Sequence, residues 1–292
     1  MADENESIVE YLSTKCGCTG IRSCLFCKDN TKTSQSTTSV DEAKTKYLFC
    51  HLCSQTLPLG GTCSHELGDC GRYGPSLDGI TLIEDFVSQR EEARIVQVID
   101  ETVWKPSQSG RRKQDYGPQV NFKKKKVKMS HFNGLPAFSG FLVRRMNDDV
   151  PGLKDFVPVE LCNLEYDEAR GSSIDAHFDD FWLWGERLVT LNLLSATRLT
   201  MTKDTYEISV PMPRRSLIIV SGAARHLWQH AVKREDISGR RIAITLRELS
   251  EEFCKGGRNE NVGFQAIKTA LTFNGTSVQL NISSNESTNK TI

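Results

Sequence analysis

Two histidines and one aspartate stand at spacings that suit a metal centre. His177 and Asp179 are separated by one residue, so their side chains point the same way only on an extended strand. His230 follows far along the chain and must come from another strand. Two imidazoles and a carboxylate can cap one face of an octahedral Fe(II) ion, leaving the other face open for O2 and a co-substrate. The spacing therefore predicts a non-heme iron site.

A strand with two arginines follows the second histidine. Arg241 and Arg247 are an even number of residues apart, so a continuous strand places both guanidinium groups on one face, together with Thr245. Guanidinium groups bind carboxylates through paired hydrogen bonds. Inward-pointing arginines are costly unless an anion pairs with them. We therefore expect this strand to hold a small dicarboxylic acid near the metal.

In this order, the motifs resemble the AlkB family of Fe(II)/2-oxoglutarate-dependent dioxygenases, which carries H-x-D, a distal histidine and R-x-N-x-T-x-R. Both arginines and the threonine of the last motif match, and Ala243 stands in place of the asparagine. The likeness extends through the segments 108–117, 162–180 and 222–230. It covers roughly residues 14–30 and most of 75–270.

The resemblance implies a role for each of these side chains. His177, Asp179 and His230 would bind iron. Arg241 would hold the distal carboxylate of 2-oxoglutarate, and Arg247 would support the metal end of the co-substrate or Asp179. The family distance to the first arginine favours His230 over His226 as the distal ligand, which leaves His226 a supporting or structural role.

Two further contacts with 2-oxoglutarate are expected from the preceding strand. Asn163 and Tyr166 resemble the family's N-x-Y pair, with one extra residue between them, and Tyr166 is the favoured contact. Asp180, next to an iron ligand, could accept a hydrogen bond from a substrate amine or could be a surface carboxylate. The implied reaction oxidises 2-oxoglutarate with O2 to succinate and CO2 and hydroxylates an N-methyl group, which then leaves as formaldehyde.

Residues 107–128 interleave basic and aromatic side chains. In AlkB relatives the matching region covers the substrate, and such side chains can grip phosphate and stack a flipped base. The alternative is a solvated, charged hairpin. Trp182 could wall the pocket or belong to the core. The predicted substrate contacts are Arg111, Arg112, Tyr116 and Trp182.

Short apolar segments predict the scaffold. A helix capped by Ser88 and running through Ile99 has apolar residues at helical spacing, and residues 138–147 predict a second helix. Closely spaced strands are expected at 80–83, 188–194, 199–201, 206–210, 216–220, 231–232 and 241–247, which indicates a sandwich or barrel. The resemblance makes this an α+β chain with a double-stranded β-helix (jelly-roll) core and supporting helices, preceded by a cysteine-rich N-terminal segment.

Three regions are expected along the chain. Residues 1–75 form the cysteine-rich segment, with a polar linker at 28–46 and a loop-rich stretch at 47–75. Residues 76–272 form the dioxygenase domain. Residues 273–292 are rich in Asn, Ser and Thr and predict a disordered tail.

Eight of the ten cysteines fall within the first 70 residues. Crowded cysteines in a reducing compartment more often bind metal than form disulfides. Tetrahedral zinc is the expected ion at Cys16, Cys18, Cys24 and Cys27. A loose reduced cluster and an Fe–S cluster are the alternatives. Cys50 and Cys53 form another close pair.

Composition sets limits on the partners. The 292 residues carry zero formal net charge, so no whole-molecule basic field favours nucleic acid. The chain contains no apolar run long enough to span a membrane and no secretory signal at its start, so we expect a cytoplasmic and nuclear location.

Three functions follow from the resemblance. The first is demethylation of monomethylated lysine in a protein, with actin as the suggested substrate. The second is demethylation of N6-methyladenine in DNA. The third is an interaction protein that recruits chromatin or cytoskeletal partners such as actomyosin, and the complete set of iron and arginine residues argues against it as the whole function.

Overall fold

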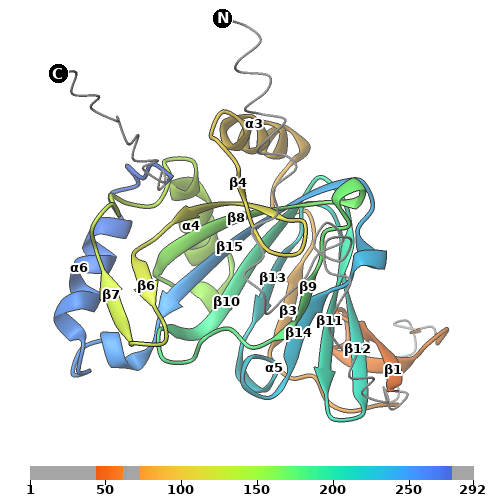
Figure 1. The fold of residues 1–292 in the computed structure, drawn as a ribbon. Coiled ribbons are helices and arrows are strands. Elements are labelled where there is room, and N and C mark those ends of the chain that lie inside the picture. The colour runs from red at the N-terminus through yellow and green to blue at the C-terminus, as the bar shows by residue number, and fades with distance from the viewer. Residues whose placement is uncertain (1–43, 62, 64–72, 278–292) are drawn as a thin grey trace, which may run out of the picture.

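The computed structural model describes residues 44–61, 63 and 73–277. Its centre is built from eight strands: β8 (Pro158–Asp167), β9 (Ile174–His177), β10 (Trp184–Leu193), β11 (Thr197–Lys203), β12 (Tyr206–Met212), β13 (Leu217–Val220), β14 (Gln229–Val232) and β15 (Arg240–Leu249). β8, β10, β13 and β15 lie in a seven-stranded sheet, whereas β9, β11, β12 and β14 lie in a six-stranded sheet (Figure 1). The chain passes back and forth between the two sheets, and the predicted double-stranded β-helix is confirmed.

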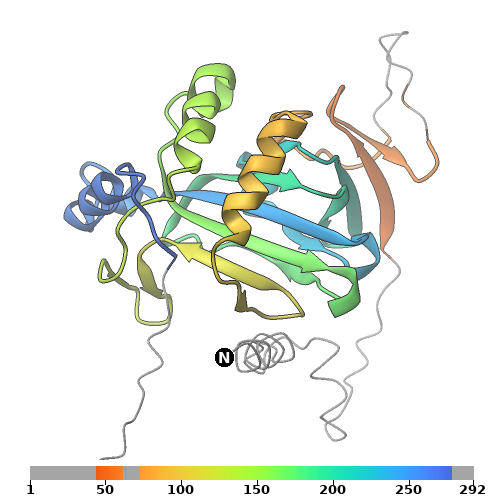
Figure 2. The ribbon, with the colours of Figure 1, turned by 90° about the horizontal axis from the view of Figure 1, so that it is seen from above.

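The seven-stranded sheet is completed by β3 (Ile80–Ile83), β4 (Lys105–Pro106) and β5 (Arg112–Tyr116), in the order β3-β13-β10-β15-β8-β5-β4. Helix α3 (Gln89–Asp100) lies across this sheet, and helix α4 (Ser139–Asp149) stands beside one end of it (Figure 2). Ser88 caps α3 as predicted, in a reciprocal capping box with Glu91. Ile95 and Ile99 of α3 and Met146 of α4 are buried in the core. The predicted helices therefore support the sheet from outside.

The six-stranded sheet begins earlier in the chain than the sequence predicts. β1 (Thr45–Cys50) pairs in parallel with β12, and β2 (Gln55–Pro58) pairs with β1, which gives the order β2-β1-β12-β11-β14-β9. Phe49 and Leu57 are buried in these strands. The expected loop-rich stretch and the boundary at residue 75 are thus wrong here. Both strands are short, and β1 pairs with β12, which is distant in sequence, so no local pattern marks them.

The remaining elements lie around the two sheets. β6 (Gln119–Asn121) and β7 (Lys126–Lys128) form a separate hairpin with exposed lysines at its turn. The helices are α5 (Gly222–Leu227) and α6 (Glu260–Ala270), and the 3-10 helices are η2 (Pro151–Leu153), η3 (Glu168–Arg170), η4 (Arg234–Asp236) and η5 (Glu251–Phe253). None of the helices in the described part of the chain is both long and apolar enough to cross a membrane.

The first residues of the predicted tail are ordered against the domain. The backbone N–H of Gly275 donates to the carbonyl of Leu135 at 2.9 Å, and that of Thr276 donates to Oδ1 of Asn133 at 3.0 Å. The boundary at residue 272 therefore does not coincide with the end of packed structure. Residues 278–292 lie outside the described part, as do Cys16, Cys18, Cys24 and Cys27.

Candidate active site

The two histidines and the aspartate come together at the edge of the six-stranded sheet. His177 at the end of β9 pairs in register with His230 on β14, and their ring centroids are 4.3 Å apart. Asp179 follows β9, with Oδ1 3.7 Å from Nε2 of His177. One ligand atom from each residue lies within 4.8 Å of the others. The convergence predicted from the sequence is confirmed.

The protonation states of these groups suit metal binding. Burial lowers the pKa of His230 to about 3, so its imidazole is neutral and keeps a lone pair for a metal. Burial acts to raise the pKa of Asp179, but the charge of Arg247 and a hydrogen bond from His177 hold it well below its usual range. His230 therefore presents a neutral imidazole and Asp179 an ionised carboxylate, and together with the imidazole of His177 they form a donor set that fits Fe(II).

Neighbouring groups fix the orientation of these ligands. Nδ1 of His177 lies 2.8 Å from the carbonyl of Asp175, which can only accept, so Nδ1 carries the proton and Nε2 faces the metal position. Nε of Arg247 donates to Oδ2 of Asp179 at 2.9 Å. The buried Arg225 donates to the carbonyls of Asp179 and Asp180 at 3.0 and 3.1 Å. Such outer contacts set both the geometry and the affinity of a metal site.

A pocket opens from the metal position into the space between the two sheets. Its walls are mainly aliphatic, with a few polar groups that can orient a ligand, as in most small-molecule sites. The aliphatic lining is Leu164, Ile174, Leu188, Leu199, Met212, Ile218, Val220 and Val232. The remaining lining is Tyr166, His177, Asp179, Thr190, His230, Arg241, Ala243, Thr245 and Arg247.

Arg241 carries a buried positive charge that no carboxylate among the described residues neutralises. Its Nε donates to Oδ1 of Asn192 at 2.6 Å, and its guanidinium carbon lies 4.7 Å from the centre of the Tyr166 ring. Nη1 is buried without a hydrogen-bond partner. An unpaired buried guanidinium costs several kcal/mol, on the order of 3–5, unless an anion binds it. A carboxylate of 2-oxoglutarate fits this position.

The strand that carries both arginines forms one wall of the pocket. Arg241, Ala243, Thr245 and Arg247 of β15 all line it, as the period of two predicts. Ala243, which replaces the family asparagine, pairs in register with Asn192 of β10. Asn192 therefore lies beside Ala243, and its Oδ1 accepts the hydrogen bond that orients Arg241.

The comparisons with known proteins identify the family. No family model matches the chain. The chain is 45% identical over 293 residues to the human alpha-ketoglutarate-dependent dioxygenase alkB homolog 4, covering 89% of this chain and 95% of that protein. The chain belongs to the AlkB family. The mouse protein of the same name is 42% identical, covering 90% of this chain and 96% of that protein.

A further relative and two solved structures also align with the chain. A Caenorhabditis elegans protein named DNA N6-methyl adenine demethylase is 38% identical, covering 87% of this chain and 93% of that protein. Among solved structures, OsALKBH1 aligns with a TM-score of 0.45 at 12% identity, covering 61% of this chain and 100% of that chain. A 2OG-Fe(II) oxygenase family protein from Burkholderia pseudomallei aligns with a TM-score of 0.40 at 12% identity, covering 58% of this chain and 83% of that chain. This AlkB protein is a 2-oxoglutarate- and Fe(II)-dependent dioxygenase of the demethylase type, and the expected membership of the AlkB family is confirmed.

Asn163 does not lie against the co-substrate position, and that prediction is corrected. Side chains alternate along β8, so Tyr166 faces the pocket whereas Asn163 faces the opposite side of the sheet. Nδ2 of Asn163 donates to Oε1 of Gln114 at 2.9 Å. Gln114 in turn donates to the carbonyl of Ile99 at 2.9 Å, at the end of α3. Asn163 therefore joins the sheet to a supporting helix.

Two predicted substrate contacts, Arg112 and Tyr116, also lie on the side of the seven-stranded sheet that faces away from the pocket. Arg112 makes a two-pronged ion pair with Glu165, which is also bound by Arg170 and Arg240. Tyr116 is buried on β5, with its ring on the side that Arg112 occupies. Neither side chain lines the pocket, so the substrate role predicted for both is corrected to a structural one.

Arg111 is closer to the site but is turned inward. Its side chain is buried, its Nε donates to the carbonyl of Gln108 at 3.1 Å, and its guanidinium lies 5.8 Å from the Tyr166 ring centre. It therefore packs behind a pocket residue, where a substrate phosphate would not reach it. This prediction too is corrected.

Asp180 and Trp182 follow the iron ligands and are not among the residues that line the pocket. Oδ1 of Asp180 accepts a hydrogen bond from the N–H of Leu183 at 2.9 Å and so caps the turn after Asp179. The Trp182 ring packs edge-on against Phe253 at 5.2 Å. These contacts give both residues a local structural role, and the catalytic role of Asp180 and the pocket wall from Trp182 stay predictions.

His226 lies outside the metal cluster, as the preference for His230 requires. Its Nε2 is 2.8 Å from Oε2 of Glu186, and both side chains are largely exposed.

Three supporting residues escaped the sequence analysis: Asn192, Glu160 and Arg225. Asn192 stands in the apolar run of β10, where a lone polar residue at a buried position signals a fixed hydrogen-bonding task. Glu160 accepts from Nη1 of Arg247 at 2.7 Å, and Arg225 holds the loop after β9. Neither of these two carries a comparable signal in the sequence.

Proposed function

We propose that this dioxygenase removes methyl groups from lysine side chains of a protein, with monomethylated lysine of actin as the leading candidate substrate. The observation that carries the proposal is a surplus of carboxylates beside the iron position. A methylated lysine is a cation, and a site with excess negative charge favours it over a phosphate-bearing substrate.

The carboxylates come from the segment after β9 (Asp179), from β8 (Glu160) and from β5 (Asp115). Asp179 and Glu160 both accept hydrogen bonds from Arg247, at 2.9 and 2.7 Å. Further along, Oδ2 of Asp115 lies 2.8 Å from Nζ of Lys113. The Lys113 side chain is 39% exposed and the Asp115 side chain 35%. In this group Asp179, Glu160 and Asp115 face Arg247 and Lys113, whereas the uncompensated charge of Arg241 on the same pocket wall would be taken up by the co-substrate. The remaining negative charge supports recognition of an ammonium group.

The described residues supply the supporting parts of the reaction. Bound iron, 2-oxoglutarate and O2 would supply the oxidant for the methyl C–H bond. His177, Asp179 and His230 would hold the metal, and Arg241 would orient the far carboxylate of the diacid. The aliphatic walls of the pocket exclude water from the reacting groups.

Demethylation of N6-methyladenine in DNA is the second candidate. It is supported by the Caenorhabditis elegans relative that carries this activity in its name, and by the exposed lysines of the β6–β7 turn, Lys123–Lys126. Against it, Arg111 and Arg112 are engaged by protein groups and are not offered to phosphate. The lysine proposal also implies cytoskeletal partners such as actomyosin, and a cytoplasmic and nuclear location, whereas the DNA alternative implies chromatin.

The test compares two methylated substrates under identical conditions. The full chain with Fe(II) and 2-oxoglutarate is given a monomethyl-lysine actin peptide or an N6-methyladenine oligonucleotide, and loss of the methyl mass and release of formaldehyde are measured. We expect peptide turnover that His177→Ala abolishes. Asp115→Asn is expected to raise the peptide KM while a Lys124→Ala control leaves it unchanged. Turnover of the oligonucleotide alone, weakened steeply by added salt, would overturn the lysine proposal.

A further inference from the structure

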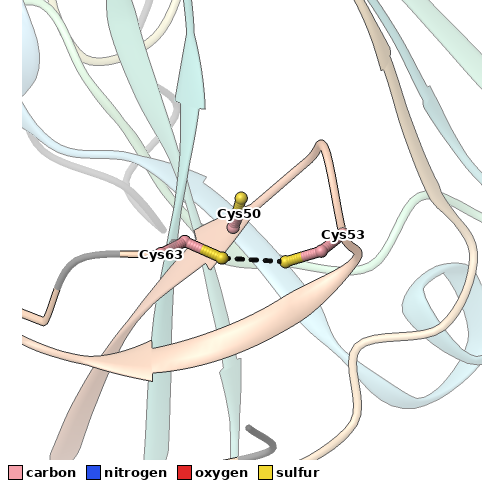
Figure 3. Close-up of side chains that lie close together, drawn as sticks. All are labelled: Cys50, Cys53 and Cys63. Carbon is pink, nitrogen blue, oxygen red and sulfur yellow. Dashed lines mark hydrogen bonds between the residues drawn. The ribbon is translucent and has the colours of Figure 1, made fainter. Parts of the chain in front are cut away.

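Two further clusters of polar or reactive side chains lie outside the metal ligands. The first gathers the sulfur atoms of Cys50, Cys53 and Cys63 within 4.8 Å of one another at the β1–β2 hairpin (Figure 3). Cys63 is disulfide-bonded, so this cluster does not offer three thiolates to a metal ion. The second cluster surrounds Arg241, at the end of the β15 pocket wall opposite to Arg247.

Asn192 is the neutral polar side chain at the centre of this second cluster. It is fully buried, and it lies on the same face of β10 as the pocket residues Leu188 and Thr190, because side chains alternate along a strand. In register it stands opposite Ala243 of β15. Asn192 therefore lies on the pocket side of the sheet, next to Arg241.

Three backbone carbonyls fix the orientation of the Asn192 amide. Its Nδ2 donates to the carbonyls of Ser195, Met212 and Pro213, at 3.0, 3.1 and 2.9 Å. A carbonyl oxygen can only accept, so the amide nitrogen has to face these groups and the amide oxygen has to face the other way. Oδ1 accepts from Nε of Arg241 at 2.6 Å. Both amide atoms are thus engaged by protein groups.

A buried carboxylate of α3 holds the two turns that supply these carbonyls. Glu92 is 1% exposed and accepts from the N–H of Leu194 at 2.8 Å, in the β10–β11 turn, and from Nε of Arg214 at 2.8 Å, in the β12–β13 turn. Leu194 and Arg215 have φ values of 72° and 65°, a strained conformation for residues other than glycine that persists only where surrounding contacts hold it. Glu92 and Asn192 hold the same two turns, so the Asn192 amide has a rigid support.

A neutral amide has a chemical advantage over a carboxylate at this position. A carboxylate beside Arg241 would pair with the guanidinium group and neutralise it. The amide oxygen fixes Nε and leaves the positive charge for a ligand. Nη1 of Arg241 is buried and has no hydrogen-bond partner among the described residues, so a donor remains for an anion.

We propose that Asn192 is a positioning residue that makes the site selective for a diacid, because it holds Arg241 in place without neutralising it. Asn192 acts through Arg241, which would bind the far carboxylate of 2-oxoglutarate. An oxo acid without that carboxylate gains nothing from the arrangement. The inference concerns the co-substrate, so it goes beyond the proposed function and does not depend on which methylated substrate is used.

An anaerobic binding titration tests the proposal without turnover. The full chain loaded with Fe(II) is titrated with 2-oxoglutarate or with 2-oxopentanoate, in which a methyl group replaces the far carboxylate, and visible absorption gives the dissociation constant of each. In Asn192→Ala the preference for 2-oxoglutarate over 2-oxopentanoate should fall about 10-fold, as expected for loss of one hydrogen bond to a charged group. An equal loss of affinity for both acids, or an unchanged preference, would overturn the proposal.

Asn147→Ala is the matched control. Nδ2 of Asn147 on α4 also donates to two carbonyls, those of Leu153 and Phe156, but this residue does not line the pocket. The preference for the diacid should stay at the wild-type value in this variant. If Asn192→Ala does not fold, Asn192→Ser decides, because its hydroxyl keeps a donor for a carbonyl but leaves Nε of Arg241 without its acceptor.

A second-site substitution separates positioning of Arg241 from a general structural role. Ala243 lines the pocket opposite Asn192, so Ala243→Asn offers an amide to Arg241 from its own strand. Adding Ala243→Asn to Asn192→Ala should recover most of the preference for 2-oxoglutarate, although the carbonyls of the two turns stay without their donor. A double variant that discriminates between the two acids no better than Asn192→Ala would contradict the proposal.

Discussion

Nε of Arg247 donates a hydrogen bond to Oδ2 of Asp179 at 2.9 Å, which leaves Oδ1, 3.7 Å from Nε2 of His177, to face the metal position. One arginine thus decides which carboxylate oxygen the metal meets. The same arginine lines the pocket in which the co-substrate would lie. Ligand orientation and co-substrate binding are therefore coupled through a single side chain.

Replacing Arg247 should weaken iron binding. In Arg247→Lys the ammonium cannot hold Asp179 and Glu160 together in a fixed geometry, and loss of such an outer contact typically costs about 10–100-fold in metal affinity. Titration with Fe(II) under anaerobic conditions measures the effect. Arg198→Lys is the matched control, at an exposed arginine that makes a 3.9 Å ion pair with Asp236 and a 3.3 Å hydrogen bond to Ser209. An unchanged affinity in Arg247→Lys would show that Asp179 needs no such support.

Replacing Arg241 should affect the co-substrate and spare the iron. Arg241→Lys loses the fork that meets a carboxylate, so the KM for 2-oxoglutarate should rise by about 10–100-fold, equivalent to about 1.4–2.8 kcal/mol. Arg240→Lys changes the neighbouring residue, whose side chain pairs with Asp100 and Glu165 away from the pocket. That control should leave the KM unchanged. Equal KM values in both variants would remove Arg241 from the co-substrate site.

Asn163 should matter for stability and not for catalysis. Asn163→Ala leaves the buried Oε1 of Gln114 without its donor, which costs about 1–3 kcal/mol of unfolding free energy. The KM for 2-oxoglutarate should stay at the wild-type value. Denaturant unfolding and steady-state kinetics separate the two effects. A raised KM with unchanged stability would restore the contact that the sequence suggested.

The ion-pair cluster around Glu165 should make stability depend on acidic pH. Burial acts to raise the pKa of Glu165, but hydrogen bonds from Arg112 and the charges of Arg112 and Arg170 outweigh it and hold the pKa below its usual value. The stabilisation is therefore complete above the unfolded value of about 4.3 and is lost as the pH falls through the lower folded value.

The matched variant is Glu165→Gln. It leaves three guanidinium groups without their shared carboxylate and should cost about 3–5 kcal/mol at neutral pH. Its unfolding free energy should then change less than that of the wild type between about pH 5 and 3. Parallel pH profiles for the two proteins would contradict the assignment of this titration to Glu165.

The sequence was sufficient to predict the site residues where their chemical types and their spacing indicated the same structure. The even separation of Arg241 and Arg247 requires a strand, and both residues occupy one face of β15 as expected. His177 is the last residue of β9 and Asp179 lies just after the strand, yet both side chains reach the metal position. The distant His230 was found because its order after the aspartate matches the family. These features depend on local backbone geometry that a sequence records directly.

The errors came from contacts that no local pattern records. Asn163 and Tyr166 are an odd number of residues apart, so on a regular strand they cannot both face the pocket. On β8 it is Tyr166 that lines the pocket. Arg112 looked like an exposed cation, but its partner Glu165 lies on a strand more than fifty residues later. β1 was missed for the same reason, since its pairing with β12 joins distant parts of the chain.

The most direct test of the iron and 2-oxoglutarate site is an anaerobic titration followed by visible absorption. Adding 2-oxoglutarate to the full chain loaded with Fe(II) should produce a charge-transfer band that saturates at one equivalent of each per chain. His230→Ala should abolish the band, and Arg241→Lys should shift its appearance to about 10–100-fold higher 2-oxoglutarate. A band of undiminished intensity in His177→Ala, Asp179→Ala and His230→Ala alike would contradict the convergence of these three side chains on one ferrous ion.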